Sequence, residues 1–110
     1  MDMTVDEVDG ITRIALVGML DAKGASAVEV RFAAVTASHK QVVVDLAGVG
    51  YLASIGIRML VMAGKAAAGR GGKLALFGAS EPVAKVIGAS GLDLIVPLGP
   101  DCAAACGLVA

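Results

Sequence analysis

The sequence predicts one small α/β domain over residues 1–110, with a mixed, mostly parallel sheet of four to five strands and about four helices. Its length of 110 residues is typical of a single domain. Strand-like apolar segments alternate along the chain with segments whose apolar residues recur at helical spacing. One segment, Gln41–Leu46, is β-branched without alternation, which indicates a central strand covered on both faces.

The chain is expected to open with a hairpin and a helix. Ile11–Gly18 alternates as a strand does, and the pair Asp9-Gly10 before it is a strong signal for a tight turn. The acidic segment Val5–Gly10 would then supply the first arm. A helix follows, in which the core residues Val28, Phe32 and Val35 recur at helical spacing and which ends near Thr36.

The middle of the chain repeats the order of strand, loop and helix. After the central strand, a loop over Ala47–Ser54 is expected to lead into a helix over Ile55–Gly69. The glycine-rich stretch Gly69–Gly72 ends that helix and makes a turn, because it precedes a strand and lacks the Lys-Ser/Thr of a phosphate-binding loop.

The last third is predicted to contain two short strands and two helices. Lys73–Gly78 forms a buried strand, and Ser80 with Pro82 marks the start of a short helix that stops near Gly88 or Gly91. The remaining elements are a last strand over Leu94–Pro97 and a terminal helix over Asp101–Leu108.

Composition excludes several classes of function. The net charge of −1 and the aromatic content of 3% argue against nucleic acid as a partner, and leave Phe32, Tyr51 and Phe77 as the few large rings for the interior. The acidic N-terminus does not resemble an export signal, and no apolar stretch approaches the length of a membrane-spanning helix. A cytoplasmic protein is expected, with Cys102 and Cys106 as reduced thiols because their spacing suits a disulfide poorly.

Groupings for catalysis or for metal binding are scarce. His39 is the single histidine and is expected to be a solvated surface side chain, so a two-histidine metal site is impossible. The two cysteines are expected to be small packing residues of the terminal helix. We therefore predict no catalytic residues, no metal, no cofactor and no enzymatic activity.

Ser54 stands where the central strand and its loop give way to a helix. A serine at that position caps the free amide groups of the first helical turn. The same geometry suits a regulatory phosphate, which would carry about −1.5 to −2 charges beside the positive end of the helix dipole. Both interpretations remain open from the residues alone.

The run VVVDLAGVGYLASIGIRML resembles the signature of STAS domains, in which a strand ending in Asp-Leu leads to Asp-Ser-x-Gly and a helix. The resemblance extends to Gly18-Met19-Leu20-Asp21, to Gly71–Leu76 and to Pro82–Lys85 followed by Ser90-Gly91-Leu92, so ordered matches cover nearly the whole chain. One position departs from the pattern. The family's acidic residue before the serine is Ala53 in this chain.

This resemblance implies a bacterial anti-sigma factor antagonist. In such proteins the motif serine, here Ser54, is phosphorylated by an anti-sigma factor that is also a kinase, and only the unphosphorylated form binds that partner. Gly56 matches the motif glycine, and Asp21 matches an acidic position near the partner-binding surface.

The helix after Ser54 carries two apolar lines. Ile55, Met59, Met62 and Ala66, joined by Leu60 and Ala63, are expected to face the core, while Arg58 and Lys65 form a charged stripe. Roughly opposite the core stripe lies a second line. It is either covered by another element or a partner-docking patch, and it consists of Ile57, Val61, Gly64 and Ala68.

The leading hypothesis is a partner-switching regulator that binds an anti-sigma factor or serine kinase through Asp21, Ser54, Gly56, Ile57, Arg58, Val61 and Gly64. The alternative is a STAS accessory subunit of a lipid or anion transport system, which binds its ATPase without phosphorylation. A small-ligand binder or an enzyme is the remaining possibility. The residues do not indicate an oligomeric state.

Overall fold

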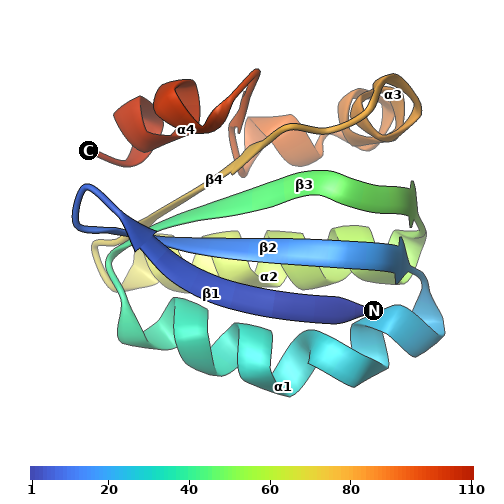
Figure 1. The fold of residues 1–110 in the computed structure, drawn as a ribbon, viewed down its shortest axis with the longest axis horizontal. Helices are drawn as coiled ribbons and strands as arrows, with labels where there is room; N and C mark the ends of the chain where they lie inside the picture. The colour runs from blue at the N-terminus through green and yellow to red at the C-terminus, as the bar shows by residue number, and fades with distance from the viewer.

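The computed structural model describes all residues 1–110 as one five-stranded sheet with four α-helices (Figure 1). The strands lie in the order β1-β2-β3-β4-β5; β1 and β2 are antiparallel, and every other neighbouring pair is parallel. The predicted mixed, mostly parallel α/β sheet is confirmed. In chain order the elements are β1 (Asp2–Val8), β2 (Ile11–Leu20), α1 (Ala22–Ser38), β3 (Gln41–Leu52), α2 (Ser54–Gly69), β4 (Lys73–Phe77), α3 (Glu81–Ser90), a 3-10 turn (Leu92–Leu94), β5 (Leu98–Gly99) and α4 (Cys102–Val109).

The hairpin between β1 and β2 turns on the predicted Asp-Gly pair. Asp9 has φ 52° and Gly10 has φ 80°, so both central residues of the turn have positive φ. This pattern is that of a type I′ turn, whose twist matches that of the flanking strands. The register follows, with Val8 opposite Ile11 and Asp2 opposite Val17.

β3 is the central strand, as predicted, because its sequence suits burial on both faces. Val42, Val43 and Val44 are all buried, with side chains that alternate between the two sides of the sheet. The strand continues to Leu52, however, through residues that were predicted to form a loop from Ala47. The far end of β2 pairs with this extension across two register shifts, and that pairing keeps the backbone extended.

The two faces of the sheet are covered unequally. α1 and α2 lie side by side along one face, where the larger core cluster includes the buried side chains Leu16, Phe32 and Leu60 (Figure 1). α4 covers part of the other face with Ala105 and Val109. The larger part of the core is therefore the cluster to which α1 and α2 contribute.

The C-terminal third departs from two predictions. The expected strand Leu94–Pro97 is absent: a 3-10 turn ends at Leu94, and pairing with β4 begins only at Leu98. Val96 is instead a buried core side chain. Of the predicted large interior rings, Phe32 and Phe77 are buried, but Tyr51 is 50% exposed.

No helix in the structure is both long enough and apolar enough to cross a membrane.

Candidate functional site

The candidate site lies at the edge of the sheet where the parallel strands β2 and β3 end. Leu20 and Leu52 are paired across this edge, and the backbone N–H of Ala53 donates a hydrogen bond to the carbonyl of Leu20 at 3.0 Å. Asp21 and Ser54 follow these strand ends directly. Parallel pairing thus brings together two predicted site residues that are far apart in the sequence.

Asp21 is the N-cap of α1. Its carboxylate accepts a hydrogen bond from the backbone N–H of Gly24 at 2.8 Å, and the residue is half-buried. Gly24 itself has no room for a side chain, because a Cβ there would lie 1.9 Å from the carbonyl oxygen of Met19. Asp21 therefore has a structural role at this edge, and its contact with a partner stays a prediction.

The prediction that Ser54 caps α2 is wrong. The N-cap is Ala53, whose backbone is extended at φ −90° and ψ 169° and which cannot offer a side-chain acceptor. Ser54 is the first residue of the helix and is exposed. Its hydroxyl is free of a capping role, and the first-turn amide groups of α2 have no side-chain partner.

Gly56 is buried and lets α2 approach the end of β2. A Cβ at this position would lie 2.6 Å from Cγ of Leu20 and 2.7 Å from its carbonyl oxygen. A side chain here would force the helix away from the strand. The motif glycine is thus explained by close packing, and it positions Ser54 without offering a contact surface of its own.

The predicted core stripe of α2 is buried only in part, and the second apolar line is covered. Leu60 and Ala63 are buried as expected, but Ile55 is 45% and Met62 is 59% exposed. The second line is the covered one: Ile57 and Val61 pack against the core, and a Cβ on Gly64 would lie 2.5 Å from Val96.

The cause is the turn before β5. It folds back over α2 and covers the second line, which is one of the two alternatives that the sequence left open. The docking patch of Ile57, Val61 and Gly64 is therefore not an exposed surface. Of the predicted site residues on this helix, only Ser54 and Arg58 are exposed.

An apolar groove of about 690 Å³ runs between α1 and α2. The sequence contained a signal for it in the spacing of Ile55, Met59, Met62 and Ala66, which was assigned to the core. On α1 the groove is lined by Val30 and Phe32, among others, and three charged side chains also line it: Glu29, Arg58 and Arg70.

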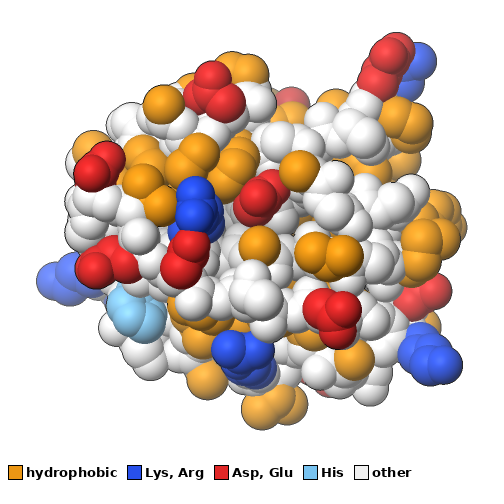
Figure 2. Space-filling view, viewed as in Figure 1, with side chains coloured by type: hydrophobic (Ala, Val, Ile, Leu, Met, Phe, Trp, Pro, Cys, Tyr) orange, Lys and Arg blue, Asp and Glu red, His pale blue; other side chains and the backbone are white.

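Other exposed apolar residues lie close to Ser54. Met19 and Tyr51 are paired across β2 and β3, and each is about half exposed, at 51% and 50%. Figure 2 shows hydrophobic side chains over this part of the sheet, interspersed with charged ones. The edge therefore presents a free hydroxyl near exposed apolar side chains, an arrangement suited to contact with another protein.

Groups for acid–base or metal chemistry do not gather at this edge. His39 is exposed at the end of α1, with Nδ1 2.8 Å from the carbonyl oxygen of Val35. The two cysteines are on α4, at the opposite end of the sheet from the start of α2 (Figure 1). No cluster of three His, Cys, Asp or Glu side chains could hold a metal ion.

Comparison with known proteins agrees with the resemblance found in the sequence motifs. Residues 3–97 match the family model described as "Mlab, STAS domain". A curated relative from Bordetella bronchiseptica, BtrV, described as an anti-sigma factor antagonist, is 30% identical over 89% of this chain and 85% of its own length.

Two solved structures share the fold. The crystal structure of an anti-sigma factor antagonist from Mycobacterium paratuberculosis is 29% identical with a TM-score of 0.80, and the match covers 98% of this chain and 92% of that one. A STAS domain protein from Planctomyces limnophilus has a TM-score of 0.84 at 20% identity, over 98% and 97% of the two chains. The resemblance in sequence motifs is thereby confirmed, and the chain belongs to the STAS domain family, with anti-sigma factor antagonists among its relatives.

Proposed function

We propose that this protein is an anti-sigma factor antagonist that acts by binding another protein, without catalysis of its own, and that phosphorylation of Ser54 switches the binding. The relatives in Bordetella and Mycobacterium support the class of function. The partner is then an anti-sigma factor that is also a serine kinase.

The observation that carries the switch is the free position of Ser54. Its hydroxyl is exposed at the first residue of α2, and Ala53 provides no competing cap for the amide groups of that turn. A phosphate there would gain hydrogen bonds from these amide groups and a favourable interaction with the helix dipole. The modification would leave the fold intact.

The effect on a partner follows from the surroundings of Ser54. Met19, Tyr51 and Ile55 are each about half exposed close to it, at 51%, 50% and 45%. A partner surface that buries these side chains would also have to desolvate the phosphate and its charge of about −2. Binding would therefore be strong without the phosphate and weak with it.

Intact-mass measurement tests the switch. The protein is incubated with a serine-kinase anti-sigma factor and ATP, and one added phosphate is expected in the wild type but not in Ser54→Ala. Ser80→Ala is the matched control, because Ser80 is also exposed at a helix start and lacks a side-chain capping bond. Phosphate that persists in Ser54→Ala, or none in the wild type, contradicts the proposal.

A binding measurement tests the surface. Ile55→Glu is expected to abolish capture of the partner while unfolding stays cooperative, because Ile55 is 45% exposed. Ile57 is a poor choice for this test, since it packs against the core and its replacement would disturb the fold. Unchanged capture by Ile55→Glu would place the partner elsewhere.

A second candidate function is that of an accessory subunit that binds the ATPase of a transport system. The specific observation in its favour is Ala53, which removes the acidic neighbour found beside the motif serine in the family. Such a subunit needs a docking edge but no phosphate. Capture of a transporter ATPase that is lost in Ile55→Glu, with no phosphate added by any serine-kinase anti-sigma factor, would favour it.

A further inference from the structure

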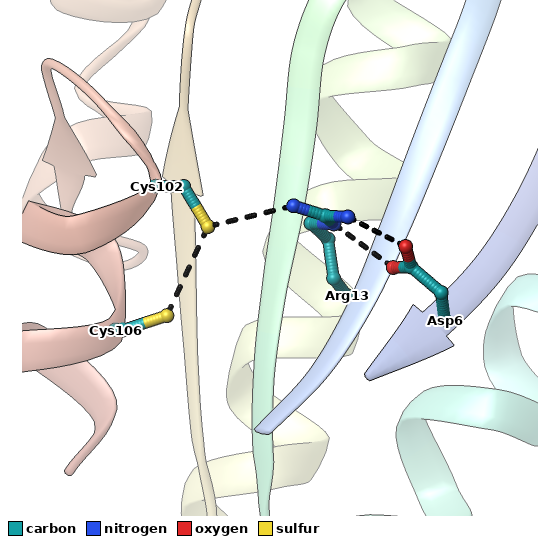
Figure 3. Close-up of polar contacts among 4 residues, drawn as sticks. All are labelled: Asp6, Arg13, Cys102 and Cys106. Atoms are coloured by element: carbon teal, nitrogen blue, oxygen red, sulfur yellow. Dashed lines mark hydrogen bonds and ion pairs between the residues drawn. The ribbon is translucent and has the colours of Figure 1, made fainter. Parts of the chain in front are cut away.

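The two cysteines of α4 face each other. Cys102 and Cys106 are separated by one helical turn, with their Sγ atoms 3.9 Å apart, and both are free thiols (Figure 3). Residues four apart in a helix have Cα atoms about 6 Å apart, within the range that disulfides span. Both side chains are half-buried, so small reagents reach them.

A cation lies beside one of the two thiols only. Nη1 of Arg13 is 3.9 Å from Sγ of Cys102, and the same guanidinium donates from Nε to Oδ1 of Asp6 at 2.9 Å (Figure 3). The ion pair holds Arg13 in place, and hydrogen bonds to Asp6 and Cys102 raise the pKa of Arg13, which therefore keeps its positive charge. Cys102 is thus the sulfur of the pair that lies beside a guanidinium.

The second thiol is in a different environment. Burial, followed by the hydrogen bond with Cys102, raises the pKa of Cys106 above its ordinary value. The pair thus combines a sulfur beside a cation with a neighbouring sulfur that stays protonated. This is the arrangement of a reactive thiol and its resolving partner.

We propose that Cys102 and Cys106 are a peroxide-sensitive dithiol that closes to an intramolecular disulfide. The Cys102 thiolate attacks one oxygen of a hydroperoxide and breaks the O–O bond, which gives a sulfenic acid at Cys102 and, after protonation, water or an alcohol. The Cys106 thiol then attacks that sulfur and displaces the hydroxyl group as water. Both thiols are oxidised and one peroxide is reduced.

Closure strains the first turn of α4. The Cβ atoms of residues four apart in a helix are about 5–6 Å apart, whereas a disulfide holds them at about 3.8 Å. The first turn of α4 must therefore distort, and it carries Ala105, which is buried against the sheet. The oxidised form is expected to melt at a lower temperature than the reduced form, and a strained disulfide of this kind is readily reduced again.

Intact mass after treatment with hydrogen peroxide tests the proposal. The wild type is expected to lose two hydrogen atoms as a monomer, and thiol reductant restores its mass. In Cys106→Ser the intermediate lacks its resolving partner, so a sulfenic acid trap, dimedone, should label Cys102. Cys102→Ser should react at least several-fold more slowly.

The role of the cation has its own pair of variants. In the Cys106→Ser background, Arg13→Gln removes the guanidinium and is expected to slow labelling of Cys102. Asp6→Asn keeps the guanidinium and one of its oxygen acceptors, so it should slow labelling less than Arg13→Gln does. Circular dichroism confirms that each variant is folded. Disulfides between two chains, addition of two oxygens to Cys102 in the wild type, or no reaction would each overturn the proposal. The outcome is independent of Ser54, which lies on α2 at the other end of the sheet.

Discussion

Replacement of Ala53 with aspartate should stabilise the domain, because it supplies the side-chain cap that α2 lacks. Asp21 and Asp101 show the geometry within this chain: each accepts a hydrogen bond from the backbone N–H three residues later, at 2.8 and 2.9 Å. Ala53 already has the extended backbone of such a cap, with φ −90° and ψ 169°. A carboxylate there would reach the N–H of Gly56.

The expected gain is about 1 kcal/mol in the free energy of unfolding, the usual difference between alanine and aspartate at an N-cap. The helix dipole adds a few tenths of a kcal/mol. For a domain of this size the melting temperature should rise by roughly 4 °C. Urea unfolding followed by circular dichroism measures the gain directly, with Ala53→Asn as the control that offers the hydrogen bond without the charge.

The pH dependence separates the two contributions. Capping lowers the pKa of the new carboxyl in the folded state below its unfolded value of about 3.9. Its stabilisation is therefore complete above that value and is lost as the pH falls through the lower, folded pKa. The gain from Ala53→Asn should not change over the same range. Equal or lower stability of Ala53→Asp at pH 7 would refute the reasoning, because it would mean that the first turn of α2 gains nothing from a cap.

Three further predictions concern packing and charge. Gly56→Ala should lower the free energy of unfolding by about 1–3 kcal/mol, because the added methyl group overcrowds the contact with β2. Gly88→Ala, in α3 with open space around it, should raise the free energy of unfolding by roughly 0.5–1 kcal/mol. Similar effects of the two substitutions would contradict the close approach of α2 to β2. Leu60→Ala should lower the free energy of unfolding by about 2–5 kcal/mol, and Met62→Ala should lower it by less than about 0.5 kcal/mol. A larger loss for Met62→Ala in urea unfolding would mean that Met62 is a core residue, as the sequence predicted. The hydrogen bond from the guanidinium of Arg13, aided by its charge, lowers the pKa of Asp6. The wild type should therefore be more stable than Asp6→Asn at pH 7, and this difference should disappear as the pH falls through the lowered pKa. A difference that persists in acid would exclude the ion pair as its source.

Local patterns were sufficient where the physical cause is local. The Asp9-Gly10 pair predicted a hairpin because few residues adopt positive φ at both turn positions. The β-branched run of β3 predicted a strand buried on both faces, since no polar position interrupts it. Spacing and order of the motifs predicted the STAS family. For the hairpin and the strand the information lies within about ten residues of sequence, and for the family it lies in the order of short motifs along the chain.

Local patterns failed where a distant segment decides the result. The extension of β3 to Leu52 depends on pairing with β2, and the brevity of β5 depends on where β4 ends. Likewise, the side of α2 that is covered depends on Val96, more than thirty residues after the helix begins, because both of its apolar lines have helical spacing. The helical spacing of apolar residues shows that one side of a helix is apolar, but it does not show which element packs against that side.

The same division holds for the site. The sequence by itself determined that Ser54 and Gly56 stand at the start of a helix behind a buried strand, because helical spacing and motif order can be read from neighbouring residues. Only the tertiary structure decided that Ala53 is the cap, that Ser54 is free, and that Cys102 meets Arg13. These features depend on contacts between elements that are distant in the chain. Such contacts form only when the sheet and its helices pack into one core.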